Sequence, residues 1–209
     1  MRLLLVILLL LVAGGGYTWW HHRPLHDAPG VVAGAEPTQD DIAAGTLLKQ
    51  GHFALAPRAK FAMTGRVLSR EDYQLDDLAP IAPTDLAMGW GRMSDSAVLD
   101  RIRISQSNRY YYWYTQEFPI PRREIEDSSA NMHMIPANDT VARELKDVRP
   151  GEVIHFEGFL VDVNRDDGWH AATSLTREDT GAGGCEIVLV ESLRQERPPG
   201  RADRYRVRE

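Results

Sequence analysis

Residues 152–163 read EVIHFEGFLVDV and carry the clearest strand signal in the chain. β-Branched and aromatic side chains dominate this stretch, and such side chains fit the pleated surface of a sheet. Gly158 lies in its middle, and a glycine inside a strand marks a bulge or a sharp bend. The stretch therefore predicts a long, curved strand of the kind used in small β-barrels.

A second strand of this kind is predicted upstream, at residues 60–70, which read KFAMTGRVLSR. Phe61, Met63 and Val67 alternate with polar or small residues, as in a strand with one buried face. Gly65 again occupies the middle of the strand. Three further stretches have strand composition: residues 101–107 (RIRISQS), 109–115 (RYYYWYT) and 186–193 (EIVLVESL).

An amphipathic helix is predicted between the third and fourth of these strands. Val141, Leu145 and Val148 recur at helical spacing and form one apolar face. Asn138 or Asp139 can accept hydrogen bonds from the first free backbone N–H groups and so act as N-cap.

The predicted order is strand, strand, strand, helix, strand, strand, with irregular segments at residues 71–100 and 118–137. An OB-fold barrel has this order, with its helix between the third and fourth strands. We therefore expect a mainly β fold with helices, an OB-like β-barrel of β-β-β-α-β-β order that follows an N-terminal transmembrane helix. Another small barrel or an α+β roll is compatible with the same order.

Residues 3–20 contain no charged side chain and begin with a continuous apolar run. A transmembrane helix needs about 17–25 residues, and Trp19 and Trp20 suit the membrane–water interface. The alternative is a cleaved signal peptide, with Arg2 as its positive end. Ala13-Gly14-Gly15 is the best small-residue cleavage site, but the bulky residues 17–20 lie just after it. We expect an uncleaved anchor in the cytoplasmic membrane with the rest of the chain outside the cytoplasm; cleavage would instead give a secreted or periplasmic protein.

The 209 residues are enough for one ordinary domain with an anchor and tails. We expect a transmembrane signal-anchor at residues 1–23, a linker at 24–50 and the OB-like domain at 51–193. The Arg-rich tail at 194–209 is expected to be disordered.

Charge and cysteine content exclude several classes of function. The formal net charge is -6, and an acidic domain repels nucleic-acid backbones. Cys185 is the only cysteine, so neither an internal disulfide nor a cysteine metal cluster is possible. We expect Cys185 to be buried beside the apolar run 187–190, and we predict neither a cofactor nor a metal site.

Aromatic residues offer two candidate binding surfaces. On a strand at residues 110–114, Tyr111 and Trp113 share one face, which is either core or a stacking platform. Trp90 stands between two glycines and either walls a pocket or plugs one end of the barrel.

Polar residues offer two more candidates. Asn131 and His133 lie in a predicted loop, where His133 is either an acid–base group or ligand contact, or a residue that locks the loop. Arg177 and Asp179 belong to the stretch SLTREDTGAGG at residues 174–184. In an OB-fold this loop helps to frame the ligand face, but a local Arg–Asp interaction explains the same residues.

Four stretches together resemble an uncharacterised bacterial family of small membrane-anchored or exported proteins. They are DLAMGWGRMSD (85–95), RISQSNRYYYW (103–113), ANMHMIPA (130–137) and SLTREDTGAGGCEIVLVE (174–191). The resemblance covers most of residues 58–191. It implies a similar layout, and it implies no activity.

The first functional hypothesis is a non-catalytic binding or interaction module of the cell envelope, with an envelope protein, peptide or glycan as partner. The second is an envelope hydrolase that uses His133 with Asp95, Asp179 or Ser174. Convergence of His133 with a carboxylate or nucleophile in a cleft would favour the enzyme.

Overall fold

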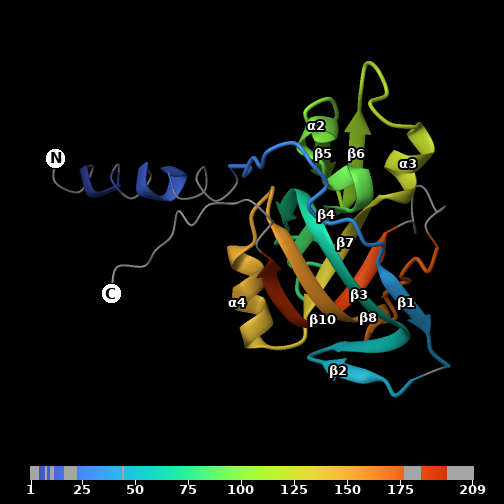
Figure 1. Cartoon of the computed structure of the whole chain (residues 1–209). Coiled ribbons are helices and arrows are strands. Elements are labelled where there is room, and N and C mark those ends of the chain that lie inside the picture. Colours follow the sequence, from blue (N-terminus) through green and yellow to red (C-terminus); the bar gives the residue numbers. More distant parts are fainter. Residues whose placement is uncertain are drawn as a thin grey trace, which may run out of the picture.

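The computed structural model describes residues 5–7, 9, 12–16, 23–43, 45–176 and 185–196. The protein is mainly β, as predicted, and its strands form a large mixed sheet and a separate two-stranded sheet (Figure 1). The helices are short and lie around the large sheet.

Five strands of the large sheet are connected in a continuous circuit of pairings. β3 (Phe53–Asp72) pairs with β4 (Thr84–Gly89), and β4 pairs with β7 (Ser129–Pro136). β7 pairs in parallel with β10 (Glu186–Glu196), which pairs with β8 (Val153–Arg165). β8 pairs in turn with β3, so the path returns to its start.

Residues 24–50, predicted as a linker, contact the domain along much of their length. β1 (Thr38–Asp41) and β2 (Leu48–Gln50) both pair with β3. Leu25 donates a backbone hydrogen bond to the Pro150 carbonyl.

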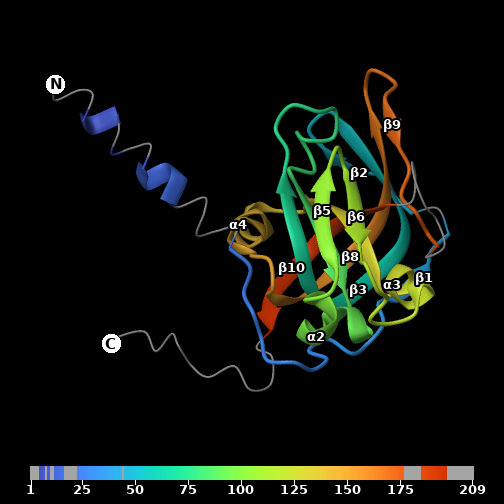
Figure 2. The same cartoon turned by 90° about the horizontal axis from the view of Figure 1, so that it is seen from above.

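The predicted second and third strands are present, but the prediction that they belong to the barrel sheet was wrong. They form β5 (Arg103–Ser107) and β6 (Tyr110–Tyr114), a hairpin whose strands pair with each other (Figure 2). The large sheet instead takes β4 and β7 from stretches predicted to be irregular.

The cause is the burial of β4 and β7 on both faces. All residues of β4 are buried, and β7 has only partly exposed residues besides its buried ones. A strand covered on both sides lacks the polar–apolar alternation that marks a half-exposed strand. β5 alternates between exposed and partly buried residues and was therefore recognised.

The main core lies on one face of these strands and is covered at one side by α4 (Asp139–Asp147). Asn138 caps α4 as predicted, because its Oδ1 accepts hydrogen bonds from the backbone of Thr140 and Val141 at 3.0 and 3.1 Å. The predicted apolar face packs on the core. The buried members of this core include Val141, Leu145 and Val148 of that face, together with Phe61, Met63, Leu86, Met88, Met132, Met134, Ile154, Phe156 and Val188.

Gly158 is needed where β8 passes β10. A Cβ atom at this position would lie 1.9 Å from the carbonyl oxygen of Leu189, closer than any side chain tolerates. The pairing of the two strands shifts register beside it, between Val190 and Ser192. The glycine therefore permits close approach of two backbones.

A smaller apolar cluster packs against the β5–β6 hairpin. It includes residues from η1 (Gly91–Ser94), α2 (Ser96–Leu99) and α3 (Arg122–Asp127). The buried side chains of this cluster are Met93, Val98, Ile102, Ile120 and Ile125, and Trp113 of the hairpin packs against them.

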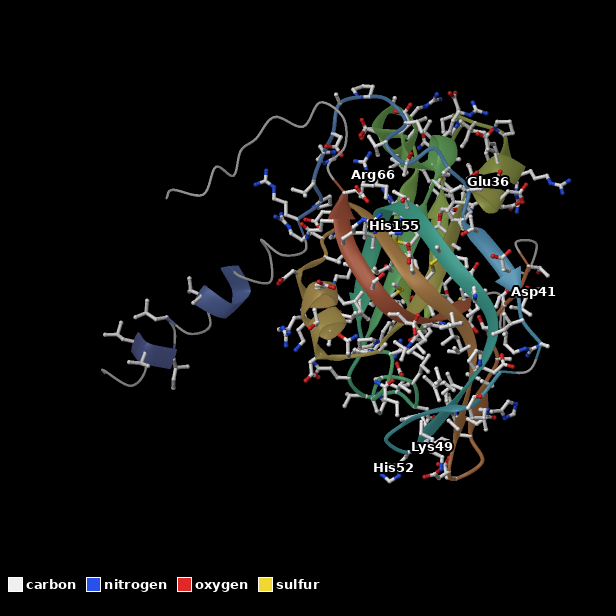
Figure 3. The ribbon with its side chains drawn as sticks, turned by 60° about the horizontal axis from the view of Figure 1, so that its bottom comes forward. Glu36, Asp41, Lys49, His52, Arg66 and His155 are labelled. Carbon is white, nitrogen blue, oxygen red and sulfur yellow. The ribbon has the colours of Figure 1, made fainter. Side chains whose placement is uncertain are left out.

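Two buried arginines hold other segments together. Arg66 is labelled in Figure 3; its guanidinium donates to the Ser94 carbonyl at 3.0 Å and to Ser96 Oγ at 2.8 Å. Arg70 donates to the carbonyls of Leu145 and Val148, the latter at 2.9 Å, at the end of α4. These arginines supply buried donors to backbone oxygens at the ends of short helical segments, where carbonyls lack their usual helical partners.

Of the predicted membrane segment, the described residues 5–7, 9 and 12–16 are helical and exposed. Within the described part of the chain, no helix is long and apolar enough to cross a membrane. Residues 194–196 of the predicted tail extend β10, and residues 197–209 lie outside the described residues.

Candidate functional site

The face of β4 and β7 that points away from the main core carries buried polar groups. Asp85 pairs in register with His133 on the neighbouring strand. Asp85 is fully buried, and Asn131 and His133 are only 4% and 7% exposed. Because strand residues alternate, these polar side chains lie opposite the core residues Leu86 and Met132.

The tip of the β5–β6 hairpin covers this polar face. Its two turn residues, Asn108 and Arg109, have φ values of 52° and 69°. A tight hairpin turn of this type favours asparagine and glycine, and an arginine there is strained. Strain of this kind is kept where the surroundings fix the residue, and it concentrates at functional sites.

Arg109 is fixed by contacts on several sides. Its guanidinium donates to Asp85 Oδ1 at 2.7 Å, to both oxygens of Asp76 at 2.8 and 2.9 Å, and to the Ala82 carbonyl at 2.9 Å. It also lies 3.9 Å from the ring centroid of Tyr73. Burial opposes ionisation of Asp76, but the Arg109 hydrogen bonds prevail and hold the pKa of Asp76 below its usual value.

His133 adds a second positive charge to this cluster. Its Nδ1 lies 2.9 Å from Asp85 Oδ1, an ion-pair distance. Burial lowers the pKa of His133, but the neighbouring Asp85 and Cys185 outweigh burial and raise that pKa to about 9. Protonated His133 and Arg109 together balance the two carboxylates of Asp76 and Asp85, so the buried cluster is neutral overall.

The Cys185 thiol lies at the edge of the same cluster. It is half-buried, and its Sγ donates to the Arg109 carbonyl at 3.6 Å. Asn131 Nδ2 lies 3.8 Å from this sulfur and also bonds Asp85 Oδ2 at 3.4 Å. Cys185 is therefore less buried than predicted, and polar groups surround it.

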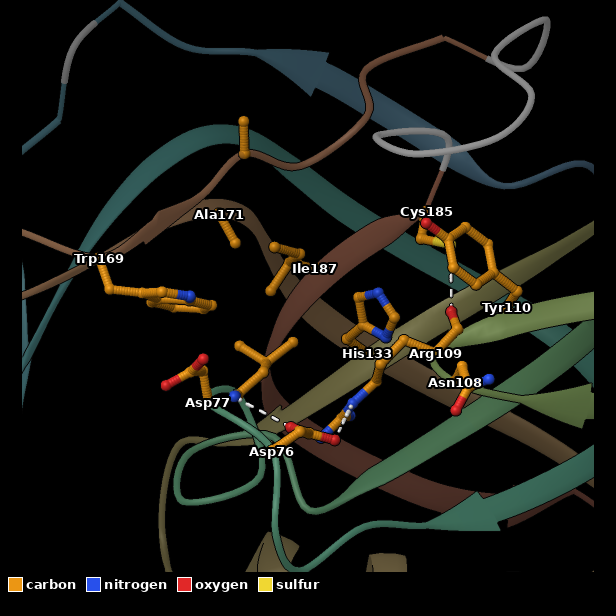
Figure 4. A pocket seen from close by; sticks show the side chains of 12 residues that line it. Asp76, Asp77, Asn108, Arg109, Tyr110, His133, Trp169, Ala171, Cys185 and Ile187 are labelled. Atoms are coloured by element: carbon orange, nitrogen blue, oxygen red, sulfur yellow. Dashed lines mark hydrogen bonds and ion pairs between the residues drawn. The ribbon is translucent and has the colours of Figure 1, made fainter.

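A pocket of about 390 Å³ opens beside these groups, and we call it the hairpin-tip pocket (Figure 4). Trp169 stands on one side of it, and His133, Tyr110 and Cys185 lie on the other. Its lining comes from five segments: Asp76, Asp77 and Leu78; Asn108, Arg109 and Tyr110; His133; Trp169, Ala171 and Ala172; and Cys185 and Ile187.

The pocket brings together only part of the predicted site. His133 lines it, on strand β7 and not in a loop, and Asn131 adjoins it. Trp90 is 3% exposed within the main core and does not line this pocket. Arg177 and Asp179 lie outside the described residues.

The aromatic face of the hairpin points into the protein. The Tyr111 hydroxyl donates to Ser129 Oγ at 3.1 Å, and burial raises the pKa of Tyr111 to about 12. Trp113 packs on the smaller apolar cluster. On the hairpin, the exposed aromatic side chains are those of Tyr112 and Tyr114, at 50% and 61%.

The partners that were predicted for His133 within the described residues serve other purposes. Asp95 caps α2 by accepting a hydrogen bond from the backbone of Ala97. Ser174 is 3% exposed and donates to the Thr176 carbonyl at 2.9 Å.

The sequence reasoning missed Asp85, Arg109 and Trp169 as site residues. One signal was available, because Asn108 and Arg109 occupy the two-residue turn of a clear hairpin, where an arginine is unexpected. Asp85 gave no signal, since it lies in a strand that was not recognised.

Among the residues that the structure describes, no group of three or more histidine, cysteine or acidic side chains is placed to hold a metal ion. Comparisons of the chain with protein-family models, with curated proteins and with solved structures found no match.

Proposed function

We propose that the five-strand circuit is an OB-like barrel that serves as a ligand-binding module. Two features of the pairing support this fold. In chain order, the first strand of the circuit pairs with the second and fourth, and the third pairs in parallel with the fifth. The helix α4 lies between the third and fourth strands. An OB-fold is a five-stranded barrel with its helix at this point.

The location of the hairpin-tip pocket supports the binding function. OB-folds bind their ligands on the face of the second and third strands, between the loops that follow the first and fourth. Here β4 and β7 are the second and third strands, and they carry Asp85 and His133. The two loops contribute Asp76 and Trp169 to the pocket.

The observation that carries the proposal is a pocket large enough for a small molecule, with the buried His133 and its ion pair to Asp85 at its side. Such pockets combine apolar walls with a few placed polar groups. Trp169 offers a flat surface for an aromatic or sugar ring. We propose a small envelope molecule, or the end of a peptide or glycan, as ligand. Residues 3–20 would hold the module on the outer side of the membrane.

Photocrosslinking in living cells tests this proposal. A compact diazirine-bearing amino acid replaces Ala171 in the pocket wall of the full chain, and the adducts are identified by mass spectrometry. The same amino acid in place of Tyr112, on the exposed side of the hairpin, is the matched control.

We expect a specific small-molecule, peptide or glycan adduct at position 171 and none at position 112. Capture at 112 alone, by a chain that is folded and expressed normally, would contradict the pocket as the binding site. It would point to the exposed hairpin face instead.

A further inference from the structure

The only cysteine of the chain borders the hairpin-tip pocket beside the buried histidine. Cys185 immediately precedes β10, and β10 runs parallel to β7 with Ile187 opposite His133. This register places Cys185 near Asn131, whose Nδ2 is 3.8 Å from Sγ. The histidine in turn faces Asp85 through Nδ1 at 2.9 Å, which leaves Nε2 as its other reactive nitrogen.

A thiol and an imidazole thus border one wall of the pocket, and a buried carboxylate lies behind the imidazole. A nucleophile, a base and a third group that orients the base form the general arrangement of nucleophilic catalysis. Resting on the pocket proposed above as the ligand site, we propose that Cys185 is the nucleophile of an acyl-transfer reaction, His133 its acid–base group and Asp85 the positioning residue.

The reaction can be written with all protons placed. In the reactive form His133 is protonated and the Cys185 thiol has released its proton to solvent, so the sulfur carries the negative charge. The sulfur attacks the acyl carbon of an ester or thioester, and the bond from that carbon to the leaving oxygen or sulfur breaks. His133 gives its proton to the leaving group, so an alcohol or thiol departs. The product on the protein is a thioester at Cys185.

Water then completes the cycle. Neutral His133 takes a proton from water as its oxygen attacks the thioester carbon. The carbon–sulfur bond breaks, a carboxylic acid leaves, and the thiolate–imidazolium pair is restored. No oxidant, reductant or metal is needed, and water is the only co-reactant.

The walls of the pocket indicate the class of acyl group. Trp169, Ile187 and Ala171 form an apolar side opposite Tyr110 and His133 (Figure 4). The volume of about 390 Å³ suits a compact aromatic or short aliphatic acyl group. Asp76 and Arg109 neutralise one another, so the pocket does not select a strongly charged group.

A chromogenic aryl ester tests the inference in the full-length protein, purified in detergent. The probe is p-nitrophenyl benzoate, and the readouts are the early burst of p-nitrophenolate and the position of the benzoyl group by peptide mass spectrometry. We expect a burst close to one equivalent of protein and a benzoyl thioester at Cys185.

Conservative variants separate chemistry from folding. Cys185→Ala and Cys185→Ser should abolish the burst while keeping the circular dichroism spectrum of the wild type. His133→Gln should slow acylation by about 10²–10⁴-fold, the usual contribution of acid–base catalysis. Arg70→Met changes a buried cation that does not line the pocket, and it should acylate like the wild type.

The two proposals can fail separately. Binding of the probe to Cys185→Ala is followed by quenching of tryptophan fluorescence, with Trp169→Ala as control. Binding without acylation of the wild type would overturn the acyl-transfer inference and leave the binding function standing. Acylation that is unchanged in His133→Gln, or that falls on lysines alone, would overturn the inference as well.

Discussion

Arg70 and Arg109 are both largely buried, but their surroundings differ in kind. Arg70 donates to backbone carbonyls at the end of α4 and to the carboxylate of Asp72. Arg109 is held by Asp76 and Asp85, in a strained turn beside a pocket. Arg70 completes the hydrogen bonding of a helix end, whereas Arg109 belongs to a charged cluster beside the hairpin-tip pocket.

The comparison shows how a structural buried charge differs from a candidate site. Carbonyls at a helix end need donors, and a cation there is also favoured by the helix dipole. The Arg70 contacts therefore have a complete structural explanation. Around Arg109, His133 and Cys185 also line a pocket. Packing of the hairpin tip on the sheet does not by itself require such a pocket.

Replacing Asp85 should have the largest effect and break the Arg109 cluster. Asp85→Ala leaves Arg109 and His133 as buried cations without their shared partner. Removal of one member of a buried ion pair costs about 3–5 kcal/mol. Urea unfolding of the purified protein measures the loss. Asp76→Ala is the control, and because that side chain is 37% exposed its loss should be about 1 kcal/mol or less. Equal losses would contradict the assigned difference.

The charge of His133 should make the stability of the Arg109 cluster depend on pH. Its pKa is raised in the folded protein, so protonated His133 stabilises the fold fully below its ordinary pKa of about 6.5. This contribution, up to about 3 kcal/mol, is lost as the pH rises through about 9.

Urea unfolding at a series of pH values compares the wild type with His133→Gln. The stability difference between them should shrink between neutral pH and pH values above 9. A difference that stays constant with pH would show that His133 is neutral in the folded protein.

Arg70→Met should lower stability without touching the pocket. The variant removes donors from the carbonyls of Leu145 and Val148, and an unsatisfied buried polar group costs about 1–3 kcal/mol. Arg109→Met should lower stability more, by about 3–5 kcal/mol, because it removes this cation from the buried Asp85 carboxylate, and it should also abolish crosslinking from position 171. Loss of crosslinking in both variants would remove the distinction between the two arginines.

The exposed hairpin face should give the smallest effect. Tyr112→Ser and Tyr114→Ser change side chains that are half or more exposed. Surface substitutions of this kind change stability by roughly 0.5 kcal/mol or less. Thermal unfolding and crosslinking from position 171 should both match the wild type. A drop in crosslinking would mean that the ligand extends onto the hairpin.

Sequence patterns predicted the elements that have one solvent-exposed and one buried face. The helix around Val141 and Leu145 and the strands around Phe61 and Phe156 were found because their apolar residues recur at fixed spacing. β4 and β7 were not predicted as strands, because both of their faces are buried and their sequences do not alternate.

The site was harder to predict than the fold, for a related reason. Asp85 and His133 are far apart in the sequence and meet only through strand pairing. Polar residues such as Asn131 and His133 indicated a loop, because their burial depends on a hairpin tip that packs over them. His133 was singled out by its chemistry, whereas Arg109 and Trp169 acquire their meaning from tertiary contacts alone.

The rate at which iodoacetamide alkylates Cys185 reports how far His133 activates this thiol, because the chain has no other cysteine. The rate is measured at neutral pH in the wild type, in His133→Gln and in Arg70→Met. We expect His133→Gln to slow alkylation by about tenfold or more, because an imidazolium no longer stabilises the thiolate. Arg70→Met should react like the wild type. Equal rates in all three folded proteins would contradict this activation by His133 and would leave the cluster around Arg109 as purely structural as the contacts of Arg70.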